Sequence, residues 1–360
     1  MRALIVGYYG YGNAGDEALL SCLLQQLPKG VTPVVLSQDP LATAQTYAAF
    51  EVVACARRDG IKLWQLAQET DALIWGGGGL IQDVTSWRSP IYYLGLMGLA
   101  QSQGSRTVAW AQGIGPLQRS WLQSLARRAF GGCTGISVRD RGSAALLENW
   151  GIPYLEAPDP VWALDPLPME LDRPSPQIAV VVREHPQLTP TRVAVLTQAL
   201  AQLQAATGSH VLLLPFQLAA KPESPSADET LAHLIAGQLN AGQLSGAQVL
   251  RIRDPRQLRG VFEHVNWALV MRFHGLVMAA AAGCRCFGLS YDPKVSFLLE
   301  ELGFPGWGLE QIPGDPDLIS QIWLEHFLQG SQLSPEQISQ WRQGALRHGQ
   351  LLDQHLGNGV

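Results

Sequence analysis

Asn266-Trp267-Ala268-Leu269-Val270-Met271, followed at once by Arg272-Phe273-His274-Gly275, is the stretch that sets the fold class. A continuous, mainly apolar run of this length is typical of a strand buried on both faces, as in a parallel sheet. The small residues of 276–283 predict a helix directly after it. A strand that passes into a helix in this way is the repeating unit of an α/β fold.

The same alternation runs along the N-terminal half. Apolar runs predict strands at residues 3–6, 34–36, 72–75, 107–111, 135–138 and 154–156, and helical patterns lie near 17–26, 61–68, 92–101, 121–129 and 143–150. Strands that alternate with helices at this spacing predict a mostly parallel, doubly wound sheet.

A proline-rich, unpatterned segment at residues 165–176 indicates a domain boundary. We therefore predict an N-terminal α/β domain at 1–170, a linker at 171–176 and a second α/β domain at 177–330. Strands of the second domain are expected at 178–182, 211–214, 248–250, 267–270 and 286–289. Residues 331–360 predict a terminal helix with Ser334 as N-cap, which is expected to pack on a neighbouring surface such as the N-terminal domain.

Composition limits the function classes. The chain has 360 residues, 47% hydrophobic and 15% charged, which supplies two cores and excludes a disordered chain. A net charge of −5 gives no overall basic field for nucleic acid. Five cysteines without zinc-ligand spacing favour reduced thiols and a cytoplasmic location. No apolar run approaches the roughly 18 residues of a membrane span.

Positively charged residues gather after the predicted strands of the second domain. Arg183 follows the first of them, Arg272 and His274 follow the strand at 267–270, and Lys294, one of only four lysines, follows the next. Ligands of open α/β sheets bind beyond the carboxyl ends of the strands. Arg272 also needs an anionic partner if it is buried. These residues predict a site for an anion, with a histidine that can donate a proton.

The N-terminal loop contains a formal Gly-x-Gly-x-x-Gly from Gly10 to Gly15, which suggests a dinucleotide site. Asp16 opposes that interpretation, since a carboxylate at a helix N-terminus repels a phosphate. Two other interpretations remain open and are compatible. Asp16 caps the helix, or Asn13 and Asp16 face the hydroxyl groups of a neutral ligand such as a sugar.

Further candidates follow other strands of the N-terminal half. Gly77, Gly78 and Gly79 belong to four consecutive glycines after the strand at 72–75, more than a turn needs, and Gln112 follows the strand at 107–111. Arg139 ends another strand, where it either reaches an anion or forms a surface pair with Asp140. We expect these segments to line one edge of the sheet.

The ordered set of motifs resembles the polysaccharide pyruvyl transferase family, in particular the bacterial branch that modifies cell-wall and S-layer-anchoring polysaccharides. The motifs lie at residues 7–17, 75–79, 112–116, 138–140, 159–161, 271–274 and 289–295, and the resemblance covers residues 1–305. Where the family has Arg-Leu-His, this chain has Arg272-Phe273-His274. The resemblance implies two Rossmann-like domains facing a cleft, as in GT-B glycosyltransferases. It implies phosphoenolpyruvate as donor and a lipid-linked oligosaccharide as acceptor.

With phosphoenolpyruvate as donor, we expect His274 to be the general acid and Arg272 and Lys294 to hold the anionic groups of the donor. Arg183, Arg139 and the N-terminal glycine segments would bind substrate. No metal or other cofactor is expected, and a lipid-linked acceptor suggests contact with the inner face of the membrane. A nucleotide-sugar glycosyltransferase of the same fold is the main alternative. A nicotinamide-binding protein and a non-catalytic sugar-binding module are further alternatives.

Overall fold

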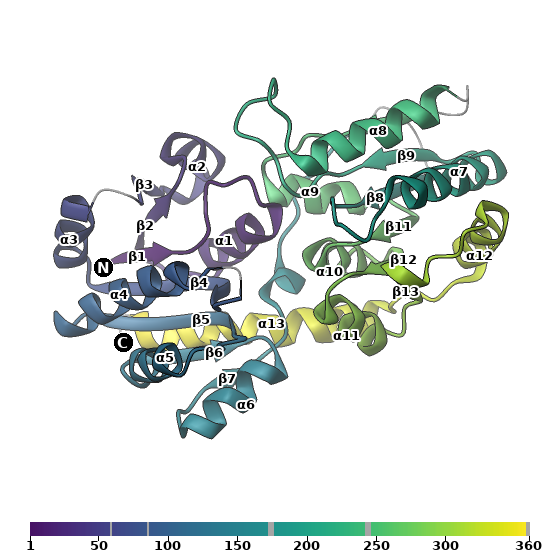
Figure 1. Ribbon diagram of the computed structural model, residues 1–360. Helices are drawn as coiled ribbons and strands as arrows, with labels where there is room; N and C mark the ends of the chain where they lie inside the picture. The colour runs from purple at the N-terminus through teal and green to yellow at the C-terminus, as the bar shows by residue number, and fades with distance from the viewer. Residues whose placement is uncertain (58–59, 85, 172–175, 242–245, 358–360) are drawn as a thin grey trace. The chain divides into compact units, whose positions relative to one another are not determined.

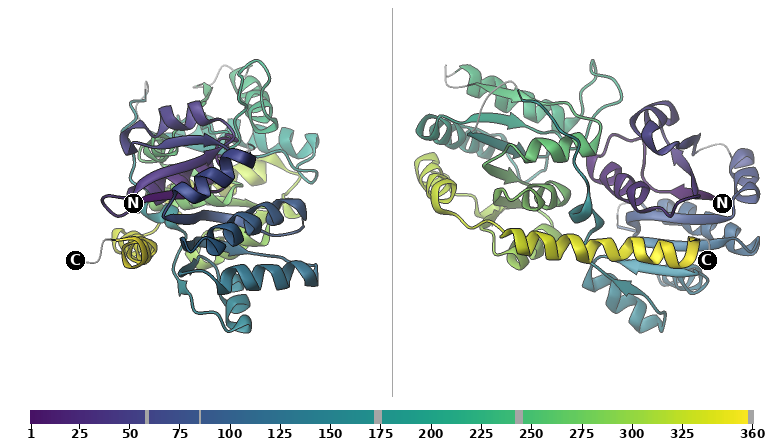
Figure 2. Two further views of the ribbon diagram at one scale, coloured as in Figure 1. Left: turned by 90° about the vertical axis from the view of Figure 1, so that its left-hand side faces the viewer. Right: turned by 180° about the vertical axis from the view of Figure 1, so that it is seen from behind.

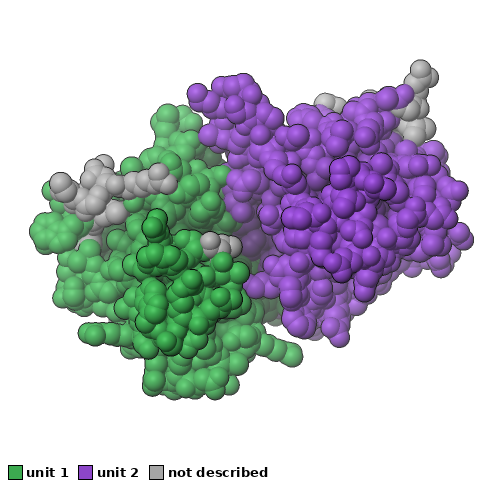
Figure 3. Space-filling model, in the orientation of Figure 1, with its two compact units in different colours: residues 1–11, 16–164, 341–360 green, residues 12–15, 165–340 purple. Residues whose placement is uncertain are grey.

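The computed structural model describes residues 1–360 apart from 58–59, 85, 172–175, 242–245 and 358–360 (Figure 1). The chain forms two compact units, coloured in Figure 3. Unit 1 contains residues 1–11, 16–164 and 341–360, and unit 2 contains residues 12–15 and 165–340. The division after residue 164 lies six residues before the boundary expected from the sequence, and the expected linker falls largely outside the described residues.

Unit 1 is a parallel sheet of seven described strands in the order β3-β2-β1-β4-β5-β6-β7. The strands are β1 (Arg2–Val6), β2 (Thr32–Ser37), β3 (Val53–Ala56), β4 (Ala72–Ile81), β5 (Arg106–Ile114), β6 (Gly135–Val138) and β7 (Leu155–Glu156). The helices are α1 (Ala14–Gln26), α2 (Pro40–Thr46), α3 (Gly60–Glu69), α4 (Arg88–Ser102), α5 (Ser120–Gly131) and α6 (Arg141–Trp150), with short turns η1 (Ala48–Phe50) and η2 (Pro160–Ala163). The direction of winding reverses between β1 and β4, where open α/β sheets bind ligands.

Unit 2 repeats this plan with six described strands in the order β10-β9-β8-β11-β12-β13. They are β8 (Gln177–Val181), β9 (His210–Leu213), β10 (Ala247–Val249), β11 (Trp267–Val270), β12 (Arg285–Ser290) and β13 (Gly306–Gly308). The helices are α7 (Pro190–Thr207), α8 (Ala227–Ala241), α9 (Pro255–Phe262), α10 (Phe273–Ala281), α11 (Pro293–Leu302) and α12 (Pro316–Gln329), with the turn η3 (Leu309–Gln311). The winding reverses between β8 and β11. The predicted doubly wound α/β class is therefore confirmed in both units.

Buried strands explain why the apolar runs predicted the sheets well. All four residues of β11 are buried, and Trp267 packs against Trp323 of α12 with ring centroids 5.5 Å apart. In unit 1, Trp75 of β4 packs against Phe130 of α5 at 5.2 Å. Aromatic side chains of this size contribute a large share of the apolar area that holds helices on a sheet.

The four glycines of 76–79 lie inside β4, so their prediction as a loop after the strand is wrong. The strand continues to Ile81 through an irregularity in its pairing with β5, and Gly77 and Gly78 take φ values of 90° and 95°. Only glycine adopts such values readily, so these residues allow a strand to bulge. Gln112 likewise lies within β5 rather than after it.

The C-terminal helix α13 (Pro335–Leu356) begins with the predicted cap, because Ser334 and Gln337 exchange hydrogen bonds of 2.9 and 3.2 Å. From Trp341 onward the helix belongs to unit 1, and Trp341 stacks on Trp162 with ring centroids 4.9 Å apart. Figure 2 shows its full length in yellow. Among the described helices, none has the length and apolar character needed to cross a membrane.

His348 is the buried polar contact of α13. Its Nε2 lies 2.9 Å from the carbonyl oxygen of Pro158, and its Nδ1 lies 2.9 Å from Oγ of Ser137. A carbonyl oxygen only accepts, so Nε2 carries the proton and Nδ1 accepts from the serine. Burial lowers the pKa of His348 from 6.5 to about 4, which keeps the imidazole neutral.

We expect the free energy of unfolding to decrease as the pH falls from 6.5 towards 4. In that range the unfolded chain binds a proton at His348 that the folded chain does not bind, which costs on the order of 1 kcal/mol per pH unit. Urea unfolding across this range measures the effect. His348→Gln keeps a donor for Pro158 and cannot titrate, so it should flatten this dependence. An equally steep dependence in the variant would assign it to other groups.

Candidate active site

The cationic residues predicted from the sequence follow neighbouring strands of unit 2, at the reversal of its winding. Arg183 follows β8, and Arg272 and His274 follow β11, which pairs with β8. Tyr291 and Lys294 follow β12, on the other side of β11. Parallel strands end at one edge, so the sheet brings these segments together.

Arg272 is held in a buried ion pair with Asp228 of α8. Nη2 of Arg272 donates to Oδ2 of Asp228, and the two side chains are only 14% and 5% exposed. Oδ2 also accepts from the backbone N–H of Gln217 at 3.2 Å. Nε of Arg272 is buried without a hydrogen-bond partner in the described part of the chain. The predicted anionic partner of Arg272 is therefore a side chain of the protein itself.

Asp228 has a perturbed pKa. Burial raises the pKa of its carboxyl group, whereas the positive charges of Arg272 and then of Arg183 lower it, and the net result is a raised pKa. Two guanidinium groups thus act on one carboxylate. The local charge is positive, which favours a further anion at this edge of the sheet.

Arg183 contacts Tyr291 across the end of the intervening strand. Nη1 of Arg183 donates to the tyrosine hydroxyl at 3.0 Å, and Cζ lies 4.9 Å from the ring centroid. The ring of His185 also packs against Tyr291, with the two ring centroids 5.1 Å apart. Since β11 lies between β8 and β12, the contact spans the end of the strand from which Arg272 and His274 follow.

His274 lies in the first turn of α10 and is half-buried. A Cβ atom placed on Gly15 would come within 2.2 Å of its Nδ1 and 3.2 Å of Oδ1 of Asn13. No side chain fits there, so Gly15 is required for this approach of the N-terminal loop to the imidazole. The structure therefore brings Asn13 and His274 together within unit 2, a pairing that sequence spacing did not suggest.

Backbone hydrogen bonds fix the N-terminal loop to unit 2. Ala14 N donates to Phe216 O and Leu218 N donates to Gly12 O, both at 2.8 Å, and Asn13 forms an antiparallel bridge with Gln217. Gly12 has a φ of 73°, and a Cβ there would lie 2.2 Å from the carbonyl oxygen of Leu218. The glycines of this loop thus serve a close approach between two backbones.

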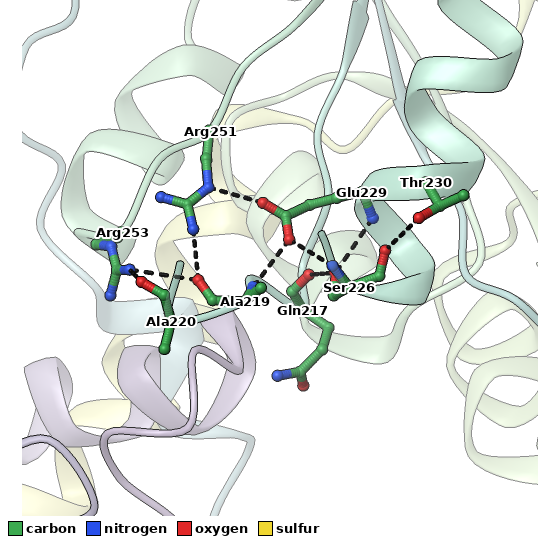
Figure 4. A network of polar contacts seen from close by, with 8 residues as sticks. All are labelled: Gln217, Ala219, Ala220, Ser226, Glu229, Thr230, Arg251 and Arg253. Carbon is green, nitrogen blue, oxygen red and sulfur yellow. Dashed lines mark hydrogen bonds and ion pairs between the residues drawn. The ribbon is translucent and has the colours of Figure 1, made fainter. Parts of the chain in front are cut away.

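Glu229 orders the segment that receives this loop (Figure 4). Its carboxylate accepts from the backbone N–H groups of Ala219 and Ser226 at 2.8 Å each and from Nε of Arg251 at 2.7 Å. Burial raises the pKa of Glu229, but these hydrogen bonds outweigh it and the net shift is downward. An ionised Glu229 therefore holds the segment that carries Gln217.

The corresponding edge of unit 1 carries Asp16 and the glycines of β4. Oδ1 of Asp16 lies 3.3 Å from the position of a Cβ on Gly78, whereas Gly79 is exposed and a Cβ there would meet nothing within 4 Å. Asp16 lies inside the first turn of α1, so its interpretation as the N-cap is wrong. Asn13 precedes the helix, and its side chain accepts from Gly15 N at 3.0 Å.

The formal dinucleotide motif from Gly10 to Gly15 forms hydrogen bonds within the protein. Gly10 N donates to Oε1 of Glu17 at 2.7 Å, and the hydroxyl of Tyr47 donates to Oε2 at 3.0 Å. A carboxylate of the protein thus occupies a backbone donor that a pyrophosphate would need. This arrangement argues against nicotinamide binding at the loop.

The remaining sequence candidates have different surroundings. Gln112 is buried, its amide nitrogen donates to the carbonyl oxygens of Trp75 and Trp110, and its Oε1 has no partner among the described residues. Arg139 pairs with buried Asp159 at 2.5 Å, not with Asp140, which caps α6. Lys294 is exposed in the first turn of α11.

Comparison with known families decides the affiliation. The model of the polysaccharide pyruvyl transferase family matches residues 13–293, well over half of the chain. The chain belongs to this family. It is thus a member of a transferase family that acts on polysaccharides. No curated protein sequence matches the chain significantly.

Solved structures with the same fold are remote in sequence. A UDP-GlcNAc 2-epimerase from Methanocaldococcus jannaschii has a TM-score of 0.64 at 7% identity, with 98% of this chain and 100% of that chain covered. The UDP-GlcNAc 2-epimerase from Neisseria meningitidis gives 0.59 at 10%, covering 98% of each. A glycosyltransferase from Rickettsia africae gives 0.56 at 11%, covering 99% of each. These likenesses show the two-domain, Rossmann-like fold of the GT-B class.

Asp228→Ala should destabilise the protein by about 3 kcal/mol, because it leaves the guanidinium of Arg272 buried without its charge partner. Urea unfolding measures this change. Glu69→Ala is the control, since it breaks an exposed pair with Arg2 and should cost less than about 1 kcal/mol. Equal changes in the free energy of unfolding for the two substitutions would show that the buried pair contributes no more to stability than the exposed pair.

Proposed function

We propose that the protein transfers pyruvate from phosphoenolpyruvate to a sugar of a lipid-linked cell-surface oligosaccharide, forming a cyclic ketal and releasing phosphate. The supporting observation is the grouping of Arg183, Arg272 and His274 at the reversal of the unit 2 sheet, in a chain of this family. An anion site beside a histidine suits a donor that carries phosphate and carboxylate and must be protonated.

The donor would bind to the guanidinium groups of unit 2. Phosphoenolpyruvate carries a phosphate of roughly −1.5 to −2 charge at neutral pH besides its carboxylate. A guanidinium group carries five N–H donors, and among the described residues Arg183 donates through Nη1 to Tyr291 and Arg272 through Nη2 to Asp228, which leaves donor capacity for an incoming anion. Exposed Lys294 would add a point charge at the same edge. The charge comes from side chains, so the reaction needs no metal or other cofactor.

The proposed chemistry starts with His274 as imidazolium. Its proton goes to the methylene carbon, whose π electron pair forms the new C–H bond, and C2 becomes electrophilic. One sugar hydroxyl adds to C2 and loses its proton, which restores the imidazolium. The bond from C2 to the phosphate oxygen then breaks, and phosphate leaves with that electron pair. A second hydroxyl of the sugar closes the ketal, and its proton balances the released phosphate.

The acceptor would bind at the edge of unit 1. The carboxylate of Asp16 can accept hydrogen bonds from sugar hydroxyls, and the open space at Gly79 leaves room for a ring beside the strand. Gly77 and Gly78 shape this segment, and Gln112 lies opposite Gly78 in the sheet. Asn13 would act nearer to His274. Arg139 already has a carboxylate partner, so its contribution would be to position Asp159 and η2.

A nucleotide-sugar glycosyltransferase is the second candidate. The structural neighbours include UDP-GlcNAc 2-epimerases, one of them bound to UDP-GlcNAc, and the arginines of unit 2 would also suit a diphosphate. The two candidates differ in the donor consumed. Incubation with phosphoenolpyruvate and candidate acceptor glycans should release phosphate and add a pyruvyl ketal to the acceptor mass. Glycosyl transfer from a nucleotide sugar, without phosphate release from phosphoenolpyruvate, would overturn the proposal.

His274→Ala should lower turnover by about 10²- to 10⁴-fold, the usual contribution of a general acid, with a smaller change in phosphoenolpyruvate binding. Steady-state rates of phosphate release and donor titration measure the two effects. His233→Ala is the control, because His233 is exposed on α8 and outside the proposed site. Turnover near that of the unchanged protein in His274→Ala would remove His274 from the mechanism.

A further inference from the structure

A long segment of unit 1 carries only positive charge. No aspartate or glutamate occurs between Asp83 and Asp140, whereas this stretch contains six arginines, in a protein with a net charge of −5. Three of the six have internal partners: Arg106 donates to the carbonyl of His355, Arg119 pairs with Asp83, and Arg139 pairs with Asp159. Four of the six are exposed around α4 and α5: Arg88, Arg119, Arg127 and Arg128.

Two exposed tryptophans lie among these arginines. Trp87 and Trp121 are 43% and 48% exposed and pack edge to face, with ring centroids 6.4 Å apart. Cζ of Arg88 lies 5.4 Å from the Trp87 ring. Val84 and Leu125 are also exposed. We call the tryptophan pair and the four arginines the Trp–Arg patch.

The patch continues along one face of α5. Trp121, Leu125 and Arg128 are spaced four and three residues apart, so they share a helix face, and all three are exposed. The helix is anchored to the core through buried residues on another face, which include Leu122 and Ala126. An outward face that combines tryptophan, leucine and arginine is typical of helices that lie in a membrane interface.

The patch has a fixed structure. The buried carboxylate of Asp83 accepts from the backbone N–H groups of Gln118 and Arg119 at 2.8 and 3.0 Å and pairs with the Arg119 guanidinium at 3.1 Å. These contacts hold Asp83 to the start of α5, and α4 and α5 pack together (Figures 1 and 2). Trp87 and Trp121 are thus presented together without further folding.

The position of the patch relates it to the proposed acceptor site. Trp87 lies after β4 and Trp121 after β5, so both follow the carboxyl ends of the strands that carry Gly79 and Gln112. A sugar bound at this edge would be close to whatever surface the patch contacts. This part of the inference rests on the proposed function, whereas the contact itself does not.

We propose that the Trp–Arg patch docks unit 1 onto an anionic phospholipid surface. Arginines bind lipid phosphates and are attracted by the negative surface potential, while tryptophan rings settle at the level of the headgroups. The acid-free segment supplies charge complementarity, and the tryptophan pair supplies the amphipathic contact. A lipid-linked acceptor held in the same surface would then present its sugar beside β4 and β5.

Co-sedimentation of the full chain with vesicles tests the proposal. We expect binding to vesicles of phosphatidylcholine with phosphatidylglycerol, weak binding to phosphatidylcholine alone, and loss of binding at high salt. Arg127→Ala with Arg128→Ala should weaken binding about 25-fold, since each basic residue near the surface contributes about fivefold. Trp87→Ser with Trp121→Ser should weaken it further and abolish the blue shift of tryptophan emission that vesicles induce.

Trp64→Ser is the matched control, because Trp64 is 52% exposed on α3, outside the patch. Trp64→Ser should bind vesicles like the unchanged protein. The midpoint of thermal unfolding should be the same in all variants as in the unchanged protein. Vesicle binding that survives both double substitutions would overturn the proposal, as would sedimentation showing that the patch is buried between two copies of the chain. Phosphate release from phosphoenolpyruvate with a water-soluble acceptor should persist in the double variants. Its absence from the unchanged protein would count against the proposed function and not against docking.

Discussion

The ion pair between Arg272 and Asp228 is the interaction on which the geometry of unit 2 depends. It joins the residue after β11 to the first turn of α8, and the same carboxylate holds the backbone of Gln217 after β9. Removing two charges from water is costly, so such a pair persists only where both partners are fixed. The pair therefore arranges three segments of the sheet edge before any ligand arrives.

This arrangement also explains why Arg272 can be largely buried when no anionic ligand is bound. Asp228 supplies the counter-charge, but its own pKa is raised by burial, so it is a poorly solvated carboxylate with two guanidinium groups near it. An incoming anion would share the arginines with Asp228 and would not have to create the site. Preorganised charge of this kind is the usual source of electrostatic stabilisation in enzymes.

The sequence predicted the fold class and the arginine–histidine group because both depend on local pattern. Apolar runs marked β4, β5 and β11, and Ser334 with Gln337 marked the start of α13. The partners Asp228 and Asp159 were not foreseen, since an aspartate near the start of a helix is ordinary and its pairing with a distant arginine depends on the folded chain. The glycines of β4 were wrongly predicted to form a loop, because their role depends on pairing with another strand. Glycine is common in turns, and a bulge inside a strand has no separate sequence signal.

Gly15 and Asp16 are neighbours in the first turn of α1, yet they belong to different units. Gly15 faces the imidazole of His274, and Asp16 lies beside Gly78 of β4. One peptide bond joins the two, inside a hydrogen-bonded helical turn whose φ and ψ angles are tightly restricted. Under the proposed function, in which the donor binds to unit 2 and the acceptor to unit 1, a substitution that reshapes this turn would alter the binding of both substrates.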